Sequence, residues 1–223
     1  MKLTSIFKKD QSFQQLKCFA VFFLIVAPVV YCTIEFAAFL GYTLPFFLFF
    51  LGWFIWTFVE YILHRFWNHA KGVENNSIVH RHHHHHTHPT DIYVSATHRS
   101  MMLLIDLALI SLSIWLNPHI MFIAGLWTGF FWFFLMHYFL HQKWTKKVFP
   151  RLVRYHVVHH CKEPDTCFGI SAAWWDGIFG TTPKKNKEIS ERILAFYYKK
   201  EKQGCSISSL IDEKLSDTQR HKH

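Results

Sequence analysis

Two long regions that are almost free of charge constrain this chain more than any other feature. Residues 18–59 contain a single charged side chain, Glu35, and residues 100–136 contain only Asp106. About 20 apolar residues in a helix cross the hydrocarbon core of a bilayer, and each region is long enough for two such helices. The pattern therefore predicts an all-α integral membrane protein with four transmembrane helices, near residues 17–38, 43–65, 100–117 and 119–141.

The basic residues predict which ends of these helices share one side of the membrane. Of the 24 Lys and Arg residues, four lie in 2–17, four in 65–99 and the other sixteen after residue 142. Basic residues concentrate in cytoplasmic loops of multi-pass proteins, so both termini and the long loop before residue 100 are expected in the cytoplasm. The net charge of +9 then suits a membrane surface and does not require a nucleic-acid partner.

The chain divides into three predicted parts. Residues 1–16 are basic and suited to an amphipathic helix along the membrane interface. Residues 17–182 form the main domain, and residues 183–223 form a polar cytoplasmic tail. The five cysteines include no C-x-x-C pair, so they are expected to be reduced thiols.

Fourteen of the 18 histidines are concentrated in four clusters, each next to a predicted cytoplasmic helix end. The topology places all four at one membrane surface, where they can converge on one site. Polar groups at membrane depth are costly and usually functional. The clusters read EYILHRFWNH (60–69), VHRHHHHHTHPTD (79–91), HYFLH (137–141) and RYHVVHH (154–160).

Spacing within the last two clusters predicts metal half-sites. His137 and His141 are i, i+4 neighbours, and His156, His159 and His160 share one helix face. Imidazole is a good ligand for iron, zinc, copper and nickel. A single histidine at a helix end is more often a capping or interfacial residue, and a poly-His run alone is more often a weak chelator. Four clusters on one side favour a built centre, and about ten ligands suit two ions.

Two questions remain open from spacing alone. His64 and His69 are five residues apart, about 140° around an ideal helix at ~100° per residue, so both can face one site only if the helix ends or bends between them. The poly-His run also allows two registers of H-x2-HH, one with His80, His83 and His84 and the other with His82, His85 and His86.

The motif order resembles the membrane fatty acid hydroxylase superfamily, relatives of the sterol desaturases, and within it the fatty acid 2-hydroxylases. Besides EYILHRFWNH and the H-x2-HH-x2-P-x-D ending of the poly-His run, the most specific stretch is RYHVVHHCKEPDTCFGISAAWWDGIFGT (154–181). The resemblance covers roughly residues 45–182. It implies a four-helix transmembrane fold under a cytoplasmic, histidine-rich helical cap.

The resemblance also implies the chemistry. Two iron ions would activate O2 and hydroxylate the carbon next to an acyl carboxyl group, with zinc possible in purified protein. Electrons would come from a separate carrier, of the cytochrome b type or a ferredoxin with its reductase, because no fused haem domain is expected from the sequence. Pro89 and Asp91 select the later register, and the implied metal ligands are His64, His69, His82, His85, His86, His137, His141, His156, His159 and His160.

Three carboxylates are candidates for the surroundings of the metal ligands. Glu60 could accept the free ring N–H of His64, or could pair with an arginine at the interface. Asp176 could orient a ligand or shape the turn before Gly177, and Asp91 could cap a helix.

Two other functions remain possible from the sequence. A sterol or carotenoid hydroxylase or desaturase would use the same fold, although the F-G-I…W-D…F-G-T stretch favours an acyl substrate. A membrane metal-ion transporter would also carry histidines, but the clusters are expected beyond the spans and not in mid-membrane.

Overall fold

Four long helices dominate the computed structural model, which describes residues 2–35, 37–69, 82, 84–89, 92, 94–183 and 189–198. They are α1 (Lys2–Glu35), α3 (Leu44–Ile62) with its π-helical continuation η2 (Leu63–Asn68), α5 (Ala96–Trp115) and α6 (Ile120–Leu140). Each includes a stretch long and apolar enough to cross a membrane. The predicted all-α fold with four spans is therefore confirmed, and the described part of the chain contains no strand.

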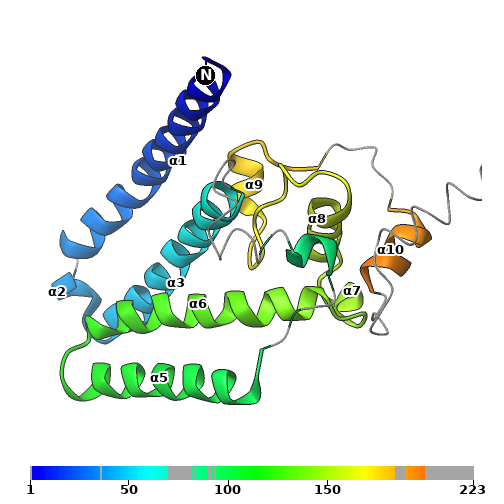
Figure 1. Ribbon diagram of the computed structural model, residues 1–223. Coiled ribbons are helices and arrows are strands. Elements are labelled where there is room, and N and C mark those ends of the chain that lie inside the picture. Colours follow the sequence, from blue (N-terminus) through cyan, green and yellow to red (C-terminus); the bar gives the residue numbers. More distant parts are fainter. Residues whose placement is uncertain are drawn as a thin grey trace, which may run out of the picture.

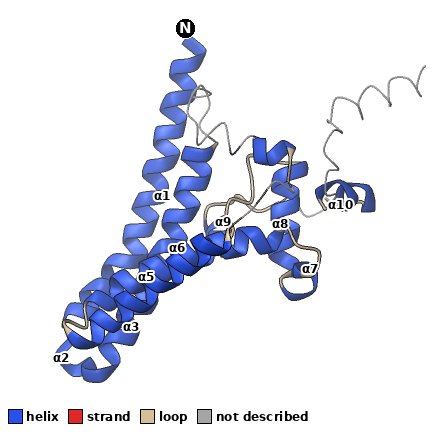
Figure 2. Ribbon diagram, turned by 60° about the horizontal axis from the view of Figure 1, so that its bottom comes forward, coloured by secondary structure: helices blue, strands red, loops and turns tan. Residues whose placement is uncertain are grey.

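Short helices connect and cap the long ones. α2 (Ala37–Leu40) and η1 (Gly41–Thr43) link α1 to α3, whereas α7 (Thr145–Val148), α8 (Pro150–Cys161), α9 (Trp174–Ile178) and α10 (Glu191–Tyr197) follow α6. Figure 1 shows the two short links at one end of the helices and α7–α10 gathered at the other, and Figure 2 shows the same division. This arrangement brings the C-terminal ends of α3 and α6 to the capped end.

The ends of the chain are only partly described. α1 continues without a break from Lys2 into the candidate span Gln11–Glu35, and an interfacial position for residues 1–16 stays a prediction. Of the polar tail, residues 183 and 189–198 are described, including α10. The remainder, residues 184–188 and 199–223, lies outside the described residues.

Helices α3 and α6 approach each other closely because glycines lie where they cross. A Cβ atom on Gly52 would collide with the backbone carbonyl of Phe122, and one on Gly125 would collide with the carbonyl of Phe49. Small residues allow this close packing in membranes, where no hydrophobic force pulls helices together. The crossing therefore fixes the angle at which α3 and α6 deliver their C-terminal histidines.

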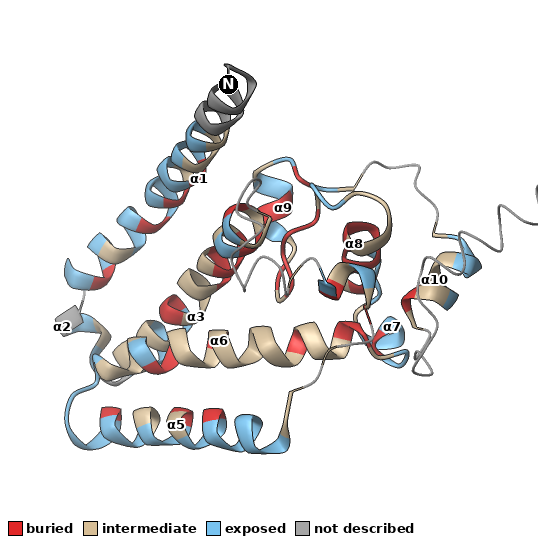
Figure 3. Cartoon of the chain, viewed as in Figure 1, coloured by how far each residue is buried: buried red, intermediate tan, exposed pale blue. Residues whose placement is uncertain are grey.

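The hairpin of α5 and α6 is closed by polar contacts. The carboxylate of Asp106 in α5 accepts a 2.7 Å hydrogen bond from the Thr128 hydroxyl in α6, and the Trp127 indole donates to the Met102 carbonyl at 2.9 Å. The outer face of α5 is exposed and apolar (Figure 3), as expected for a helix that faces lipid.

An aromatic core joins α1, α3 and α9. The rings of Phe22 and Phe58 stack at 3.9 Å, and Trp175 packs against both while its indole donates to Thr57 at 2.9 Å. This core holds the segment between α8 and α9 over the end of α3.

Candidate metal centre

The ten histidines that were predicted as ligands lie in two groups of five. Within each group, one ring nitrogen from every residue lies within 4.8 Å of all the others. The first histidine group contains His64, His69, His82, His86 and His159. The second histidine group contains His85, His137, His141, His156 and His160. The family resemblance implied this set of ten but not its division into two groups.

The π-helix η2 brings His64 and His69 to the same site. A π-helix bonds residue i to residue i+5, so residues five apart lie closer to one face of the helix than they would in an α-helix. The two ring centroids are 5.3 Å apart. The sequence left open whether the helix ends or bends between these residues; the structure has a π-helical turn there instead, and π-bulges are frequent at functional sites.

Helix α8 supplies both groups. His156 and His160, one helical turn apart, join the second group, whereas His159 on the neighbouring ridge joins the first. The poly-His run divides in the same way, with His82 and His86 in the first group and His85 in the second. The two groups are therefore direct neighbours.

The unassigned histidines of the run differ in position. The exposed ring of His84 stacks on His88, with centroids 4.3 Å apart, and neither residue belongs to a five-histidine group. His80, His83 and Asp91 lie outside the described residues, so their roles stay predictions. The structure thus brings together the histidines of the later register.

The ring nitrogens converge as ligands around a cation would. In the first group the Nε2 atom of His69 lies 2.9 Å from that of His82 and 3.1 Å from that of His159. In the second group the Nε2 atoms of His141 and His156 are 2.9 Å apart.

Burial makes these nitrogens suitable for a metal. It lowers the pKa of the imidazoles outside the spans well below the usual range, as at His141, His156, His159 and His160, so the rings are neutral and keep a lone pair. The buried Nε2 atom of His64 has no hydrogen-bond partner among the described residues. An all-imidazole donor set suits iron, zinc or copper and not magnesium or calcium, so the residues fit a pair of transition-metal ions.

Backbone carbonyls orient two rings of the first group. The Nδ1–H of His64 donates to the Phe168 carbonyl at 2.6 Å, and that of His159 donates to the Thr166 carbonyl at 2.7 Å. A proton held at Nδ1 leaves Nε2 as the ligand atom, and such outer hydrogen bonds fix ring orientation. The segment between α8 and α9 therefore sets the tautomer of both rings.

Two buried carboxylates hold that segment. The Asp176 carboxylate accepts from the N–H groups of Phe168 and Gly169 at 2.8 and 2.9 Å. The Glu60 carboxylate accepts from those of Ile170 and Ser171 at 2.8 and 2.7 Å. Four consecutive backbone N–H groups are thus satisfied by side chains from α9 and α3.

These contacts revise the roles expected for the carboxylates. Glu60 does not accept the ring N–H of His64, because the Phe168 carbonyl takes that bond. Asp176 acts on the same carbonyl indirectly, by holding the Phe168 amide, and it also accepts from the Thr181 hydroxyl at 2.7 Å. Burial raises the pKa of Asp176 to about 6, against the opposing effect of its hydrogen bonds.

The surroundings of the second group are aromatic. The fully buried ring of Tyr197, from α10, stacks on His141 at 4.8 Å and 24°, and its hydroxyl donates to the Leu140 carbonyl at 3.2 Å. The buried Nδ1 atoms of His141 and His156 have no hydrogen-bond partner in the described part of the chain. Sequence reasoning missed Tyr197; its only signal is the aromatic run 196–198 in a polar tail.

Comparison with known proteins gives one family. The family model described as "Fatty acid hydroxylase" matches residues 49–181. Dihydroceramide fatty acyl 2-hydroxylase FAH1 of Arabidopsis thaliana is 33% identical over 144 residues, which cover 60% of this chain and 59% of that protein. Ceramide very long chain fatty acid hydroxylase SCS7 of Saccharomyces cerevisiae is 31% identical over 144 residues, with 60% and 38% covered.

Two further comparisons give a human relative and a solved structure. Fatty acid 2-hydroxylase of Homo sapiens is 30% identical over 158 residues, with 62% of this chain and 40% of that protein covered. A solved structure titled "Full length scs7p (only hydroxylase domain visible)" is 26% identical, with a TM-score of 0.44 and coverage of 74% and 67%. The matched region spans less than two thirds of the length of these curated relatives.

Proposed function

Because this chain belongs to the fatty acid hydroxylase family, we propose that it is a membrane monooxygenase that hydroxylates a fatty acyl chain at C2. The balanced reaction is R–CH2–CO–X + O2 + 2 e⁻ + 2 H⁺ → R–CH(OH)–CO–X + H2O. The electrons come from a separate carrier protein, such as a cytochrome b type protein or a ferredoxin with its reductase. Family membership supports a hydroxylase of the oxidoreductase class, and the relatives' names support the acyl substrate.

The observation that carries the proposal is the pair of adjacent five-histidine groups. Each group would hold one ion, and iron is the proposed native metal, because breaking an unactivated C–H bond requires a metal that can change its oxidation state. Bound there, the iron pair supplies the activation of O2. Zinc accepts the same ligands and would give an inactive protein.

The chain itself orients the histidine rings and limits the access of water to the site. The carbonyls of Thr166 and Phe168 hold protons at Nδ1 of His159 and His64, so both rings present Nε2 inward. Burial keeps the imidazoles neutral and limits the water that could quench a reactive oxidant. The membrane delivers the apolar chain to the capped end of the helices, which we assign to the cytoplasm together with both termini.

The alternatives receive less support. The relatives' names concern fatty acyl and ceramide hydroxylation and not sterols or carotenoids. The first histidine group draws on the end of α3, the second on the end of α6, and both on α8, which does not suit a transport path through the bilayer.

Lipid analysis of cells with and without the gene tests the reaction. We expect 2-hydroxy acyl chains to appear only with an intact gene, and to be absent when His159 is replaced by alanine. Hydroxylation at another carbon would contradict the proposed position, and a change confined to sterols would contradict the proposed substrate.

A further inference from the structure

A cavity of about 1010 Å³ lies around α10 and reaches both histidine groups. It is lined by His86 of the first group and His160 of the second, whose rings stack at 4.3 Å and 16°. A small molecule in this cavity would therefore touch the boundary between the two groups. Its volume is at the upper end of the range for ligand pockets, roughly 300–1,000 Å³.

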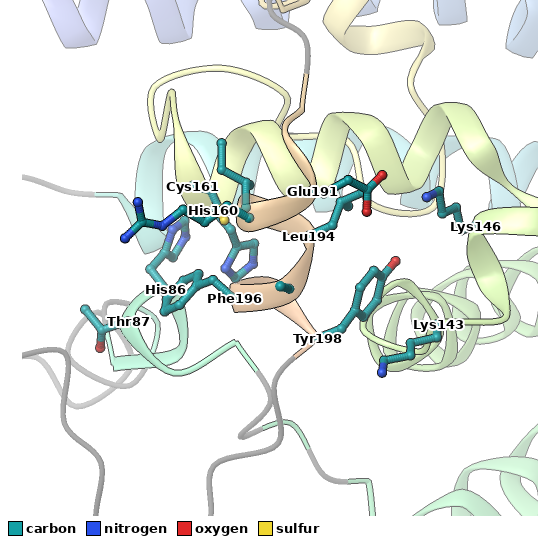
Figure 4. A pocket seen from close by; sticks show the side chains of 13 residues that line it. His86, Thr87, Lys143, Lys146, His160, Cys161, Glu191, Leu194, Phe196 and Tyr198 are labelled. Atoms are coloured by element: carbon teal, nitrogen blue, oxygen red, sulfur yellow. The ribbon is translucent and has the colours of Figure 1, made fainter. Parts of the chain in front are cut away.

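The cavity wall combines apolar and cationic side chains. Ile193, Leu194 and Phe196 of α10 supply apolar surface, whereas Lys143 and Lys146 carry positive charge. Arg192 and Glu191 also line it, and their charges offset each other. Figure 4 shows His86 and His160 on one side of α10 and the two lysines on the other.

The position of the reacting carbon relates the histidines of the cavity wall to its lysines. If C2 is hydroxylated, as proposed above, the acyl carbonyl is one bond from the reacting carbon. The head group attached to that carbonyl must then lie beside the histidine groups, while the chain extends toward the apolar helices. Lys143 and Lys146 lie on the other side of α10 from His86 and His160 (Figure 4), so a head group that extends past α10 and ends in an anion would meet them.

We propose that this cavity binds a phosphate-bearing head group on the acyl substrate, with Lys143 and Lys146 as the cationic contacts. Two sources have this chemistry, a thioester of a phosphopantetheine carrier and a phospholipid. The inference rests on the proposed C2 hydroxylation, which sets the orientation of the substrate in the cavity. It predicts that free fatty acids and neutral ceramides bind more weakly than substrates that carry a phosphate.

Equilibrium binding without turnover tests the cavity apart from catalysis. The probes are palmitoyl-coenzyme A, dipalmitoyl phosphatidylglycerol and neutral N-palmitoyl dihydrosphingosine, with the purified full chain in detergent at low salt. We expect the double variant Lys143→Gln, Lys146→Gln to weaken binding of one phosphate-bearing probe roughly tenfold, since exposed ion pairs contribute modestly. Raising the salt should remove the difference, because exposed charges are screened.

Lys147→Gln is the matched control. Lys147 is the exposed neighbour of Lys146 in α7 and does not line the cavity, so its replacement should leave the Kd unchanged. Which phosphate probe responds identifies the source of the head group. Equal binding of both phosphate probes by wild type and the double variant would overturn the inference.

Turnover separates this inference from the proposed function. With chemically reduced iron-loaded protein, the double variant should raise the KM for the responding probe and keep kcat. If wild type binds the probe through these lysines but forms no 2-hydroxy product from any substrate, the proposed function fails and the head-group site stands. If the variants slow only reduction by an acidic donor protein, the lysines dock that donor and the inference is overturned.

Discussion

The two histidine groups differ in what holds their rings in place. In the first group, carbonyls of the segment between α8 and α9 receive the Nδ1 protons of His64 and His159. In the second group, His141 is covered by the ring of Tyr197 instead. Directional hydrogen bonds thus orient His64 and His159, whereas aromatic packing from a short helix restricts His141.

This difference has consequences for metal retention. Hydrogen bonds from outer residues orient imidazole ligands and make them more basic, and their loss typically costs 10–100-fold in metal affinity or activity. Stacking restricts a ring but does not fix its tautomer. We therefore expect the first group to hold its ion more tightly, and the second group to lose its ion first on chelation.

The largest expected effect comes from removing one ligand from either group. His159→Ala or His141→Ala should reduce 2-hydroxylation at least 100-fold, because each leaves a buried group of imidazoles one ligand short. Product formation by mass spectrometry and iron content per chain measure the effect. Full activity in the purified His159→Ala protein would contradict the dimetal assignment.

A smaller and selective effect is expected at Tyr197. Tyr197→Ala leaves a cavity over His141 and should lower the metal content toward one ion per chain, whereas Tyr197→Phe keeps the stacked ring and should keep both ions. Metal analysis after mild chelation, with the thermal unfolding midpoint as a check on folding, distinguishes these outcomes. Equal loss of both ions in the alanine variant would show that the ring does not act on the second group in particular.

Replacing Asp176 tests how the hydrogen-bonded segment between α8 and α9 affects the first histidine group. Asp176→Asn replaces one of the two carboxylate oxygens that accept a backbone N–H with an NH2 group that cannot accept, which should shift the segment carrying the Phe168 and Thr166 carbonyls. We expect roughly a tenfold loss of activity and weaker metal binding in the first group. Asp165→Asn, at an exposed position of the same segment, is the control; an equal effect there would remove the argument for Asp176.

The smallest effects are expected within the poly-His run. His84→Ala should change activity less than twofold, because this exposed residue belongs to neither group. His83→Ala is predicted to behave likewise on the basis of the motif register. A loss of metal in the His83 variant, measured against His85→Ala, would show that the register is wrong.

The four spans and part of the histidine site could be predicted from the sequence, because apolar length and histidine spacing are local signals. The four spans follow from uncharged stretches, and the i, i+4 pair of His137 and His141 enters one group as its spacing suggests. Spacing failed where helix geometry departs from the ideal, at the π-helical turn before His69. It also failed to separate His159 from His160, because adjacent ridges of α8 face different neighbours.

The outer residues were harder to predict because they depend on contacts distant in sequence. Glu60 bonds to Ile170 and Ser171, 110 and 111 residues away, and no periodicity encodes that pairing. Tyr197 lies beyond the matched family region, which ends at residue 181, so the motifs gave no reason to place it over His141.

Metal content combined with a single turnover tests the central claim most directly. Protein purified anaerobically, loaded with iron and reduced, should contain two iron ions per chain and convert one equivalent of acyl substrate to its 2-hydroxy product on exposure to O2. A single ion at full activity, or two tightly bound ions with no hydroxylated product, would contradict the account.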